Sequence, residues 1–207
     1  MAPALAAERW FSAVRTPPYY PDVVTLVPGL GPEAVLAGVD AGMGCSVKDS
    51  FADVDLAPAG FEVLFAAEWL VFAAAPAEGR PPERWSRVAD QAQLADWEAA
   101  WGDAPPGSRF FPDVLLSDDR LAFLAGWDDG RIVAGAAANR SAEVVGLSNV
   151  FDAQGDVQSA WAAGAAAATE LWGDLPLVAY DHGDALSAAQ RAGFESIGPL
   201  RVWIRRG

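Results

Sequence analysis

The chain has 207 residues, of which 52% are hydrophobic and 20% are charged, a composition typical of a folded globular protein and not of a disordered one. Its formal net charge of −14 argues against binding to nucleic acid or to an anionic membrane, because both need a basic surface. A basic ligand such as an amine is compatible with this charge, and so is a role in solubility alone.

The sequence predicts a cytoplasmic protein without a metal site. Residues 1–10 lack the basic start and the long apolar core of a signal peptide, and no apolar run is long enough to span a membrane. The single cysteine, Cys45, leaves no internal disulfide and suits a reducing compartment. No Cys/His spacing is typical of a metal site.

The first 75 residues predict a helix followed by a small β-α-β-β region. Apolar residues at helical spacing indicate the first helix, and alternating or continuous apolar runs indicate the strands. The predicted elements are a helix over Ala4–Val14, a strand over Val23–Val27, a helix over Glu33–Ala41, and strands over Cys45–Leu56 and Phe61–Phe72.

Part of this region is similar to a later part of the chain. Residues 26–42, LVPGLGPEAVLAGVDAG, align without gaps with residues 177–193, LVAYDHGDALSAAQRAG. Both segments read as strand, turn, short helix and glycine. An internal duplication, with the first half as a truncated repeat, is one interpretation. Convergence of two ordinary strand–helix–strand units is the other.

A segment rich in proline and glycine, Pro76 to Pro82, divides the chain. Such composition is typical of a linker. We therefore predict an N-terminal region over residues 1–75, a linker over residues 76–84 and a second domain over residues 85–207.

The second domain predicts a helix, a hairpin, and then strands that alternate with helices. In the helix Ala89–Trp101, Leu94, Trp97 and Trp101 fall on one face and are expected in the core. An Asp-Asp-Gly turn at residues 128–130 joins the hairpin strands. The remaining elements are strands over Arg120–Trp127, Arg131–Ala138 and Glu143–Phe151, an Ala-rich helix, a strand over Leu175–Tyr180, a shorter helix, and a last strand after Gly193-Phe194.

This order of elements, with Ala192-Gly193-Phe194 before the last strand, resembles the C-terminal half of the GNAT acetyltransferase superfamily over residues 85–203. The resemblance implies an α/β fold with a mixed sheet flanked by helices, preceded here by the smaller β-α-β-β region. It also implies that acetyl-CoA lies between two splayed parallel strands. The pyrophosphate would then rest on backbone N–H groups at the start of the Ala-rich helix, where the helix dipole attracts anions.

The loop that would hold this cofactor departs from the superfamily pattern, Gln/Arg-x-x-Gly-x-Gly/Ala. Residues 152–160 read DAQGDVQSA, and no register of this segment satisfies the pattern. Asp152 and Asp156 place negative charge where the pyrophosphate would lie, without a Lys or Arg nearby in the sequence, although carboxylates there are also ordinary helix caps. The cofactor contacts that the resemblance implies are Asn149, Val150, Gln154, Gly155, Asp156 and Val157.

The candidate catalytic residues follow the second strand of this crevice. The superfamily's Asn position holds His182, the only histidine, and its general acid, a Tyr, is replaced by Ala189. The remaining candidates are Tyr180, Asp181 and His182. His182 would carry a proton at neutral pH, with Asp181 or Asp184 orienting its ring. A histidine in such a turn is also a common capping or solvated residue.

Two functions remain open. The first is an N-acyltransferase that moves an acyl group from acyl-CoA to a small amine, most of the rate coming from positioning. The second is a non-catalytic module that lost the CoA site and binds a small ligand or a protein partner. Aromatic residues would serve that role, namely Trp10, Tyr19, Tyr20, Phe110 and Phe111.

The two hypotheses predict different geometry at the crevice. The enzyme requires Asn149 and Tyr180 on splayed neighbouring strands, and free backbone N–H groups at Gly155–Val157. The binding module predicts that large side chains such as Trp161 or Trp172 fill that space.

Overall fold

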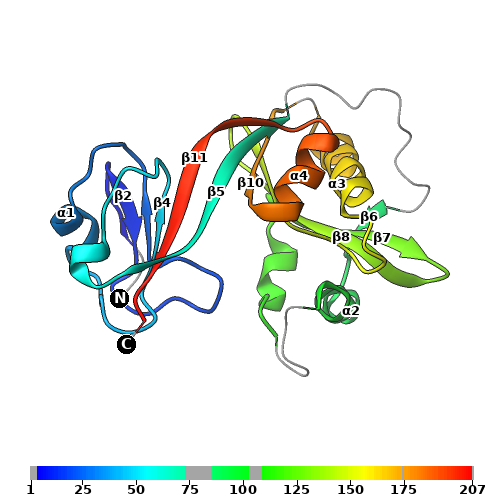
Figure 1. Cartoon of the computed structure of the whole chain (residues 1–207). Coiled ribbons are helices and arrows are strands. Elements are labelled where there is room, and N and C mark those ends of the chain that lie inside the picture. The colour runs from blue at the N-terminus through cyan, green and yellow to red at the C-terminus, as the bar shows by residue number, and fades with distance from the viewer. Residues whose placement is uncertain (1–3, 73–84, 103–108, 174, 207) are drawn as a thin grey trace. The chain divides into compact units, whose positions relative to one another are not determined.

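The computed structural model describes residues 4–72, 85–102, 109–173 and 175–206 (Figure 1). The chain divides into two compact units, which are treated separately below. Unit 1 comprises Met1–Trp69 with Ile197–Gly207, and unit 2 comprises Leu70–Ser196. The predicted linker lies outside the described residues, and the division at residues 75 and 85 therefore stays a prediction.

Unit 1 is a mixed sheet with one short helix, α1 (Pro32–Leu36), and one 3-10 helix, η1 (Ala57–Ala59). Its strands are β1 (Ala4–Leu5), β2 (Arg9–Phe11), β3 (Val23–Thr25), β4 (Ser46–Asp49), β5 (Glu62–Phe72) and β11 (Glu195–Ile204). Their order is β1-β2-β3-β4-β11-β5. Strands β3 and β4 pair in parallel, whereas β1 with β2, β2 with β3, and β4 with β11 pair antiparallel.

The predicted N-terminal helix over Ala4–Val14 is wrong. This segment forms β1 and β2, and the side chain of Leu5 is 77% exposed. The Arg9 guanidinium donates hydrogen bonds to the carbonyl oxygens of Val35 and Ala37 at the end of α1, at 2.6 and 2.5 Å. Strand pairing and this long-range contact override the helical propensity of the alanines.

Three predicted elements of unit 1 are present, and two of them are shorter than expected. Helix α1 begins at Pro32, as expected for a proline in the first turn, but ends at Leu36 because the chain turns at Gly38 with a φ of 73°. Strand β4 ends at Asp49, whose buried carboxylate accepts hydrogen bonds from the backbone N–H groups of Phe51 and Val54 and holds a turn. The long strand predicted over Phe61–Phe72 is confirmed as β5.

Unit 2 contains the elements that the resemblance implied. They are β6 (Trp85–Arg87), α2 (Gln91–Trp101), η2 (Asp113–Ser117), β7 (Leu121–Asp128), β8 (Arg131–Arg140), β9 (Val145–Asp152), α3 (Val157–Trp172), β10 (Leu177–Asp181) and α4 (Gly183–Arg191). The strand order is β5-β10-β9-β8-β7-β6, with the end of β5 as its first member. The predicted hairpin is confirmed, with Asp129 and Gly130 both at positive φ, 44° and 75°.

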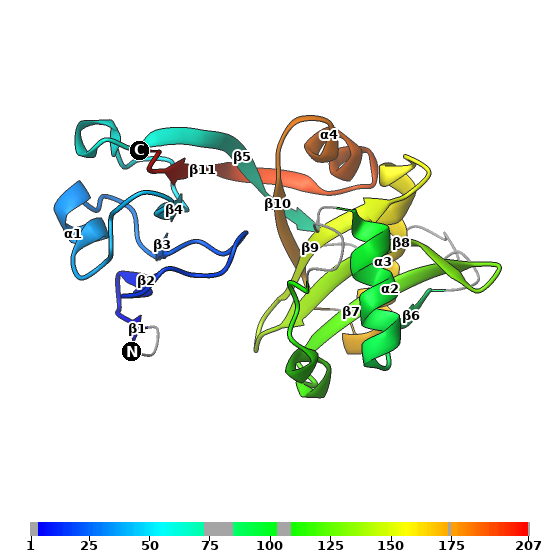
Figure 2. The ribbon, with the colours of Figure 1, turned by 90° about the horizontal axis from the view of Figure 1, so that it is seen from below.

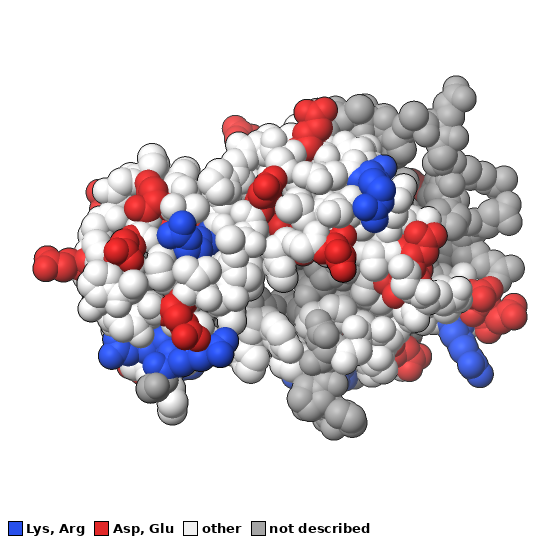
Figure 3. Space-filling view, in the orientation of Figure 1, with Lys and Arg blue, Asp and Glu red and all other residues white. Residues whose placement is uncertain are grey.

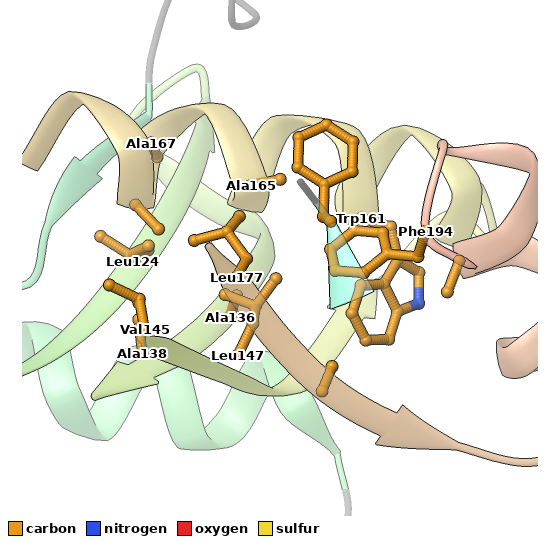
Figure 4. Packing of buried hydrophobic residues seen from close by; sticks show 14 of the residues in the cluster. Leu124, Ala136, Ala138, Val145, Leu147, Trp161, Ala165, Ala167, Leu177 and Phe194 are labelled. Carbon is orange, nitrogen blue, oxygen red and sulfur yellow. The ribbon is translucent and has the colours of Figure 1, made fainter. Parts of the chain in front are cut away.

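Helices cover both faces of the sheet in unit 2 (Figures 1 and 2). On one face α3 and α4 enclose an apolar cluster, parts of which are drawn in Figure 4. On the other face α2 packs its predicted stripe, in which Leu94 and Trp97 are fully buried and Trp97 touches Phe123 and Phe151. The stripe expected in the core is therefore confirmed.

The two similar segments begin their helices at aligned residues, Pro32 and Gly183. They differ in their strands. Strand β3 ends at Thr25, before the aligned segment, and pairs directly with β4, whereas β5 lies between β10 and β11 in the strand order. The duplication therefore stays a prediction.

Candidate functional site

Strands β9 and β10 of unit 2 separate after their first residues. Parallel pairing joins Val145 to Leu177 and Gly146 to Val178, and no later pair joins the two strands, although they continue to Asp152 and Asp181. The expected splay is present. Such a separation at the carboxyl ends of parallel strands is a usual place for a ligand in an α/β sheet.

A β-bulge lies in β9 at this separation. Gly135 pairs with Phe151 and Ala137 with Ser148, so that Asn149 and Val150 together oppose the single residue between them on β8. Asn149 has a φ of 51°, a conformation that asparagine tolerates better than most residues. Bulges bend a strand and redirect its side chains, and they are common next to sites. The resemblance implied both residues as cofactor contacts, but the sequence did not predict the bulge.

The carboxylates of the loop between β9 and α3 accept hydrogen bonds from the backbone of the same loop. Oδ1 of Asp152 accepts hydrogen bonds from the backbone N–H groups of Gln154 and Asp156, at 2.7 and 3.1 Å. The N–H of Gly155 donates to the Asp152 carbonyl oxygen at 3.2 Å. Asp156 then caps α3 by accepting from the Ser159 N–H and hydroxyl, at 3.2 and 2.7 Å. These bonds lower the pKa of Asp156.

Two backbone N–H groups at the start of α3 remain unbonded within the part of the chain that the structure describes. They belong to Val157 and Gln158, since Ser159 and Ala160 donate to Asp156. Of the three N–H groups expected to be free at Gly155–Val157, only that of Val157 is available.

One cation lies closer to this loop than the sequence suggested. Arg191, at the end of α4, donates from Nε to the side-chain oxygen of Gln158 at 3.0 Å. The guanidinium forms no ion pair with Asp152 or Asp156. The positive charge of Arg191 therefore offsets only one of the two negative charges of Asp152 and Asp156, and the net charge of the loop is negative.

These residues do not fit the pyrophosphate of acetyl-CoA. An anion site at a helix start needs unbonded N–H groups and no competing negative charge. Here the Asp152 carboxylate already holds two of the N–H groups, and Asp156 caps the helix with a second negative charge.

The three candidate catalytic residues lie together at the end of β10 and the start of α4. Tyr180 and Asp181 are partly buried and His182 is exposed. Oδ1 of Asp181 accepts from the backbone N–H of His182 at 2.8 Å. The orientation of the His182 ring by Asp181 or Asp184 stays a prediction.

Burial shapes the protonation of two of these groups. It raises the pKa of the Asp181 carboxyl, although the His182 N–H and charge oppose the rise. Burial, followed by the charge of Asp181, also raises the pKa of Tyr180. Tyr180 is thus a neutral phenol at neutral pH.

The position of the superfamily's general acid cannot serve this role here. Ala189 is fully buried and belongs to the apolar cluster beneath α3 and α4. A side chain at this position points into the core, and the substitution removes the proton donor.

Large rings pack beside the separated strands. Trp161, in the first turns of α3, is 1% exposed and meets Phe194 edge to face with ring centroids 5.0 Å apart (Figure 4). The same cluster contains Leu147 of β9 and Ala179 of β10, and Trp172 packs against its edge. Among the residues that the structure describes, the buried indole N–H of Trp161 has no hydrogen-bond partner. This packing is what the binding-module hypothesis expected of Trp161.

The aromatic residues proposed for partner binding differ in exposure. In unit 1, Tyr19 and Tyr20 are 65% and 44% exposed. In unit 2, Phe111 is buried against Trp97 and does not offer an exposed ring.

Known structures share this fold. A GCN5-related N-acetyltransferase from Kribbella flavida superposes with a TM-score of 0.61 at 18% identity, over 89% of this chain and 81% of that one. A GNAT-family putative acetyltransferase from Novosphingobium aromaticivorans superposes with a TM-score of 0.59 at 15% identity. The match covers 99% of this chain and 92% of that one. A functionally unknown conserved protein from Staphylococcus epidermidis superposes with a TM-score of 0.61 at 13% identity. The match covers 80% of this chain and 73% of that one. No protein-family model and no curated protein matches the chain. The chain therefore has the fold of the GNAT superfamily.

Proposed function

We propose that this chain is a GNAT-fold binding module that does not use acetyl-CoA at the superfamily's loop. The observation that carries the proposal is the Asp152 carboxylate, which holds the N–H groups of Gln154 and Asp156. The missing general acid at Ala189 and the packed ring of Trp161 support it.

The size of the electrostatic penalty supports the same conclusion. A carboxylate about 4 Å from a phosphate costs roughly 1–4 kcal/mol, depending on solvent screening. Each 1.4 kcal/mol weakens binding about tenfold. Asp152 and Asp156 together would therefore weaken a CoA complex by at least one power of ten. Binding would also have to break the hydrogen bonds within the loop.

The ligand of such a module is a small amine or another small molecule, or a protein partner. The net charge of −14 and the partly buried Asp181 beside the separated strands favour a cation. Acidic side chains are scattered over the face drawn in Figure 3, in both units. A protein partner would use the exposed Tyr19 and Tyr20 of unit 1.

A second candidate is an N-acyltransferase that acylates a small amine from acyl-CoA. The bulge at Asn149, the splay of β9 and β10, and the unbonded N–H of Val157 favour it. In that case Tyr180, neutral at working pH, would donate a proton, and His182 would exchange protons with solvent.

Calorimetric titration with acetyl-CoA, together with thermal unfolding, separates the two. We expect neither heat nor a rise in Tm at millimolar acetyl-CoA for the wild type. The double variant Asp152→Asn, Asp156→Asn keeps the side-chain oxygens but removes both charges, and it should bind more tightly than the wild type. Asp184→Asn, at the start of α4, is the matched control and should behave as the wild type does.

Micromolar binding by the wild type would contradict the proposal and favour the acyltransferase. Such binding would stabilise the fold by about 2.7 kcal/mol at a hundredfold excess over Kd. An amine screen with His182→Ala as control would then follow.

A further inference from the structure

Lys48 is the only lysine in the chain and lies on β4 of unit 1. It is partly buried, and its Nζ lies 4.6 Å from the ring centroid of Trp69 on β5. The indole N–H of Trp69 donates to the Ser50 carbonyl oxygen at 2.8 Å, which fixes the ring. The only lysine of this protein therefore packs over the face of an indole ring that a hydrogen bond holds in place.

The residues that pair with Lys48 on the two neighbouring strands are apolar. Successive side chains of a strand point to opposite faces, so Val47 and Asp49, both fully buried, face the cluster beneath α1, and Lys48 faces the other way. The residues directly opposite Lys48 are Val24 on β3 and Val202 on β11. The neighbouring carboxylate, Asp49, lies on the far face and binds backbone N–H groups there.

This environment lowers the pKa of Lys48 to about 8, and burial is its cause. The Trp69 ring attracts the ammonium form and works in the opposite direction, but burial outweighs it. At pH 7.4 roughly a fifth of Lys48 is then the neutral amine, against about one part in a thousand for an ordinary lysine. A neutral amine is the nucleophilic form, and burial in apolar surroundings is a usual way to activate a lysine.

We propose that Lys48 captures small apolar aldehydes as an imine, with the aldehyde substituent lying against the Trp69 ring. The Nζ lone pair attacks the carbonyl carbon to give a carbinolamine. The carbonyl oxygen then leaves as water with the two amine protons, and the C=N bond forms. No oxidant or further reactant is needed.

The surroundings favour an aldehyde over an acyl donor. Acyl transfer passes through a tetrahedral oxyanion that needs N–H donors aimed at it. The neighbours on this face, Val24 and Val202, offer apolar side chains, and the Trp69 N–H is already bonded to Ser50. The inference goes beyond the proposed function and stands or fails independently of acetyl-CoA binding.

Reductive trapping tests the proposal on the full chain. The protein is treated with benzaldehyde and cyanoborohydride between pH 6 and 10, and the peptide that contains Lys48 is quantified by mass spectrometry. Arg131→Lys supplies a matched lysine at an exposed position of the β7–β8 hairpin, and Lys48→Arg removes the nucleophile while keeping a cation.

We expect Lys48 to be benzylated at least about tenfold faster than the lysine at position 131 at pH 7.4, with a rate midpoint near pH 8. The adduct should be absent from that peptide in Lys48→Arg. Labelling of Lys48 no faster than position 131, or only above pH 9.5, would overturn the proposal. Because the rate comparison is made within one folded chain that retains Lys48, it holds even if Lys48→Arg fails to fold.

Discussion

The first turns of α3 and α4 show how similar positions in one sheet acquire different chemistry. Both helices begin where a strand of the β9–β10 pair ends, and both pack on the same apolar cluster. At α3, the carboxylates of Asp152 and Asp156 bind backbone N–H groups. At α4, the N-cap residue His182 makes no side-chain cap bond, and Asp181 accepts a hydrogen bond from the His182 N–H.

The two helix starts thus share one fold but differ in how their backbone N–H groups are bonded. A helix start attracts anions through unbonded N–H groups and the helix dipole. Asp152 accepts hydrogen bonds from the N–H groups of the loop before α3, and we propose that this loop is a structural turn and not a cofactor site. The sharpest tests of this account therefore compare substitutions at the two helix starts.

The largest expected effect concerns the ring that anchors α3. Trp161→Ala should lower the free energy of unfolding by about 3–5 kcal/mol, because it empties a fully buried site beside Phe194. Leu186→Ala, which removes a partly buried contact of α4 with the same cluster, should cost less than half as much. Trp161→Phe keeps a ring and removes the unbonded N–H, so its cost should be small.

Denaturant unfolding at pH 7 measures these differences. Equal losses for Trp161→Ala and Leu186→Ala would mean that Trp161 does not anchor the start of α3.

The next effect concerns the two carboxylates that follow the strands. Asp152→Ala should cost about 1–2 kcal/mol, since it removes the acceptor for Gln154 and Asp156. Asp181→Ala removes one such bond and should cost less than about 1 kcal/mol. Asp152→Asn, which keeps the acceptor oxygen, should recover most of the loss. Denaturant unfolding checks the order, and a larger loss at Asp181 would reverse the comparison.

An effect of similar size concerns the glycine beside each helix start. Gly155 has a φ of 91°, outside the left-handed well, and Gly183 has a φ of 57°, inside it. A methyl group at either glycine meets open space, so substitution costs only backbone strain. Gly155→Ala should cost about 2 kcal/mol and Gly183→Ala about 1 kcal/mol. Thermal unfolding of both variants checks this order, and equal values would contradict the geometry of the loop.

The two loops should also respond to acid in opposite directions. The lowered pKa of Asp156 stabilises the fold above the unfolded value near 3.9, and this contribution is lost as the pH falls through the folded pKa. The raised pKa of Asp181 destabilises the fold at neutral pH, and this penalty vanishes as the pH falls below both values.

Tm profiles between pH 3 and pH 7 measure this response. Relative to the wild type, Asp156→Asn should lower the Tm at pH 7 and Asp181→Asn should raise it, and both differences should shrink toward pH 3. Differences of the same sign would contradict the assignment.

The sequence predicted the parts of the fold that local pattern and turn chemistry determine. The Asp-Asp-Gly hairpin, the stripe of α2 and the strand β5 follow from spacing alone. The structure at the start of the chain could not be predicted from spacing, because the alanines there favour a helix. Pairing with β3 and the contact of Arg9 with α1 make Arg9–Phe11 a strand instead.

At the candidate site, the sequence indicated candidate residues but could not predict the hydrogen bonds that they form. It identified Asp152 and Asp156 as negative charges at the loop, yet the acceptor role of Asp152 depends on loop conformation. The only feature of the sequence that indicates the bulge is an asparagine, Asn149, within a largely apolar strand. The approach of Arg191 to Gln158 joins residues far apart in sequence and has no local signal.

Amide NMR of the wild type during titration with acetyl-CoA tests the closed loop most directly. The account predicts that the N–H signals of Gln154 and Asp156 stay unchanged and protected from exchange at millimolar ligand. Saturable shifts of these two signals and of Val157 at micromolar ligand would contradict it, because the pyrophosphate would then have displaced the Asp152 carboxylate.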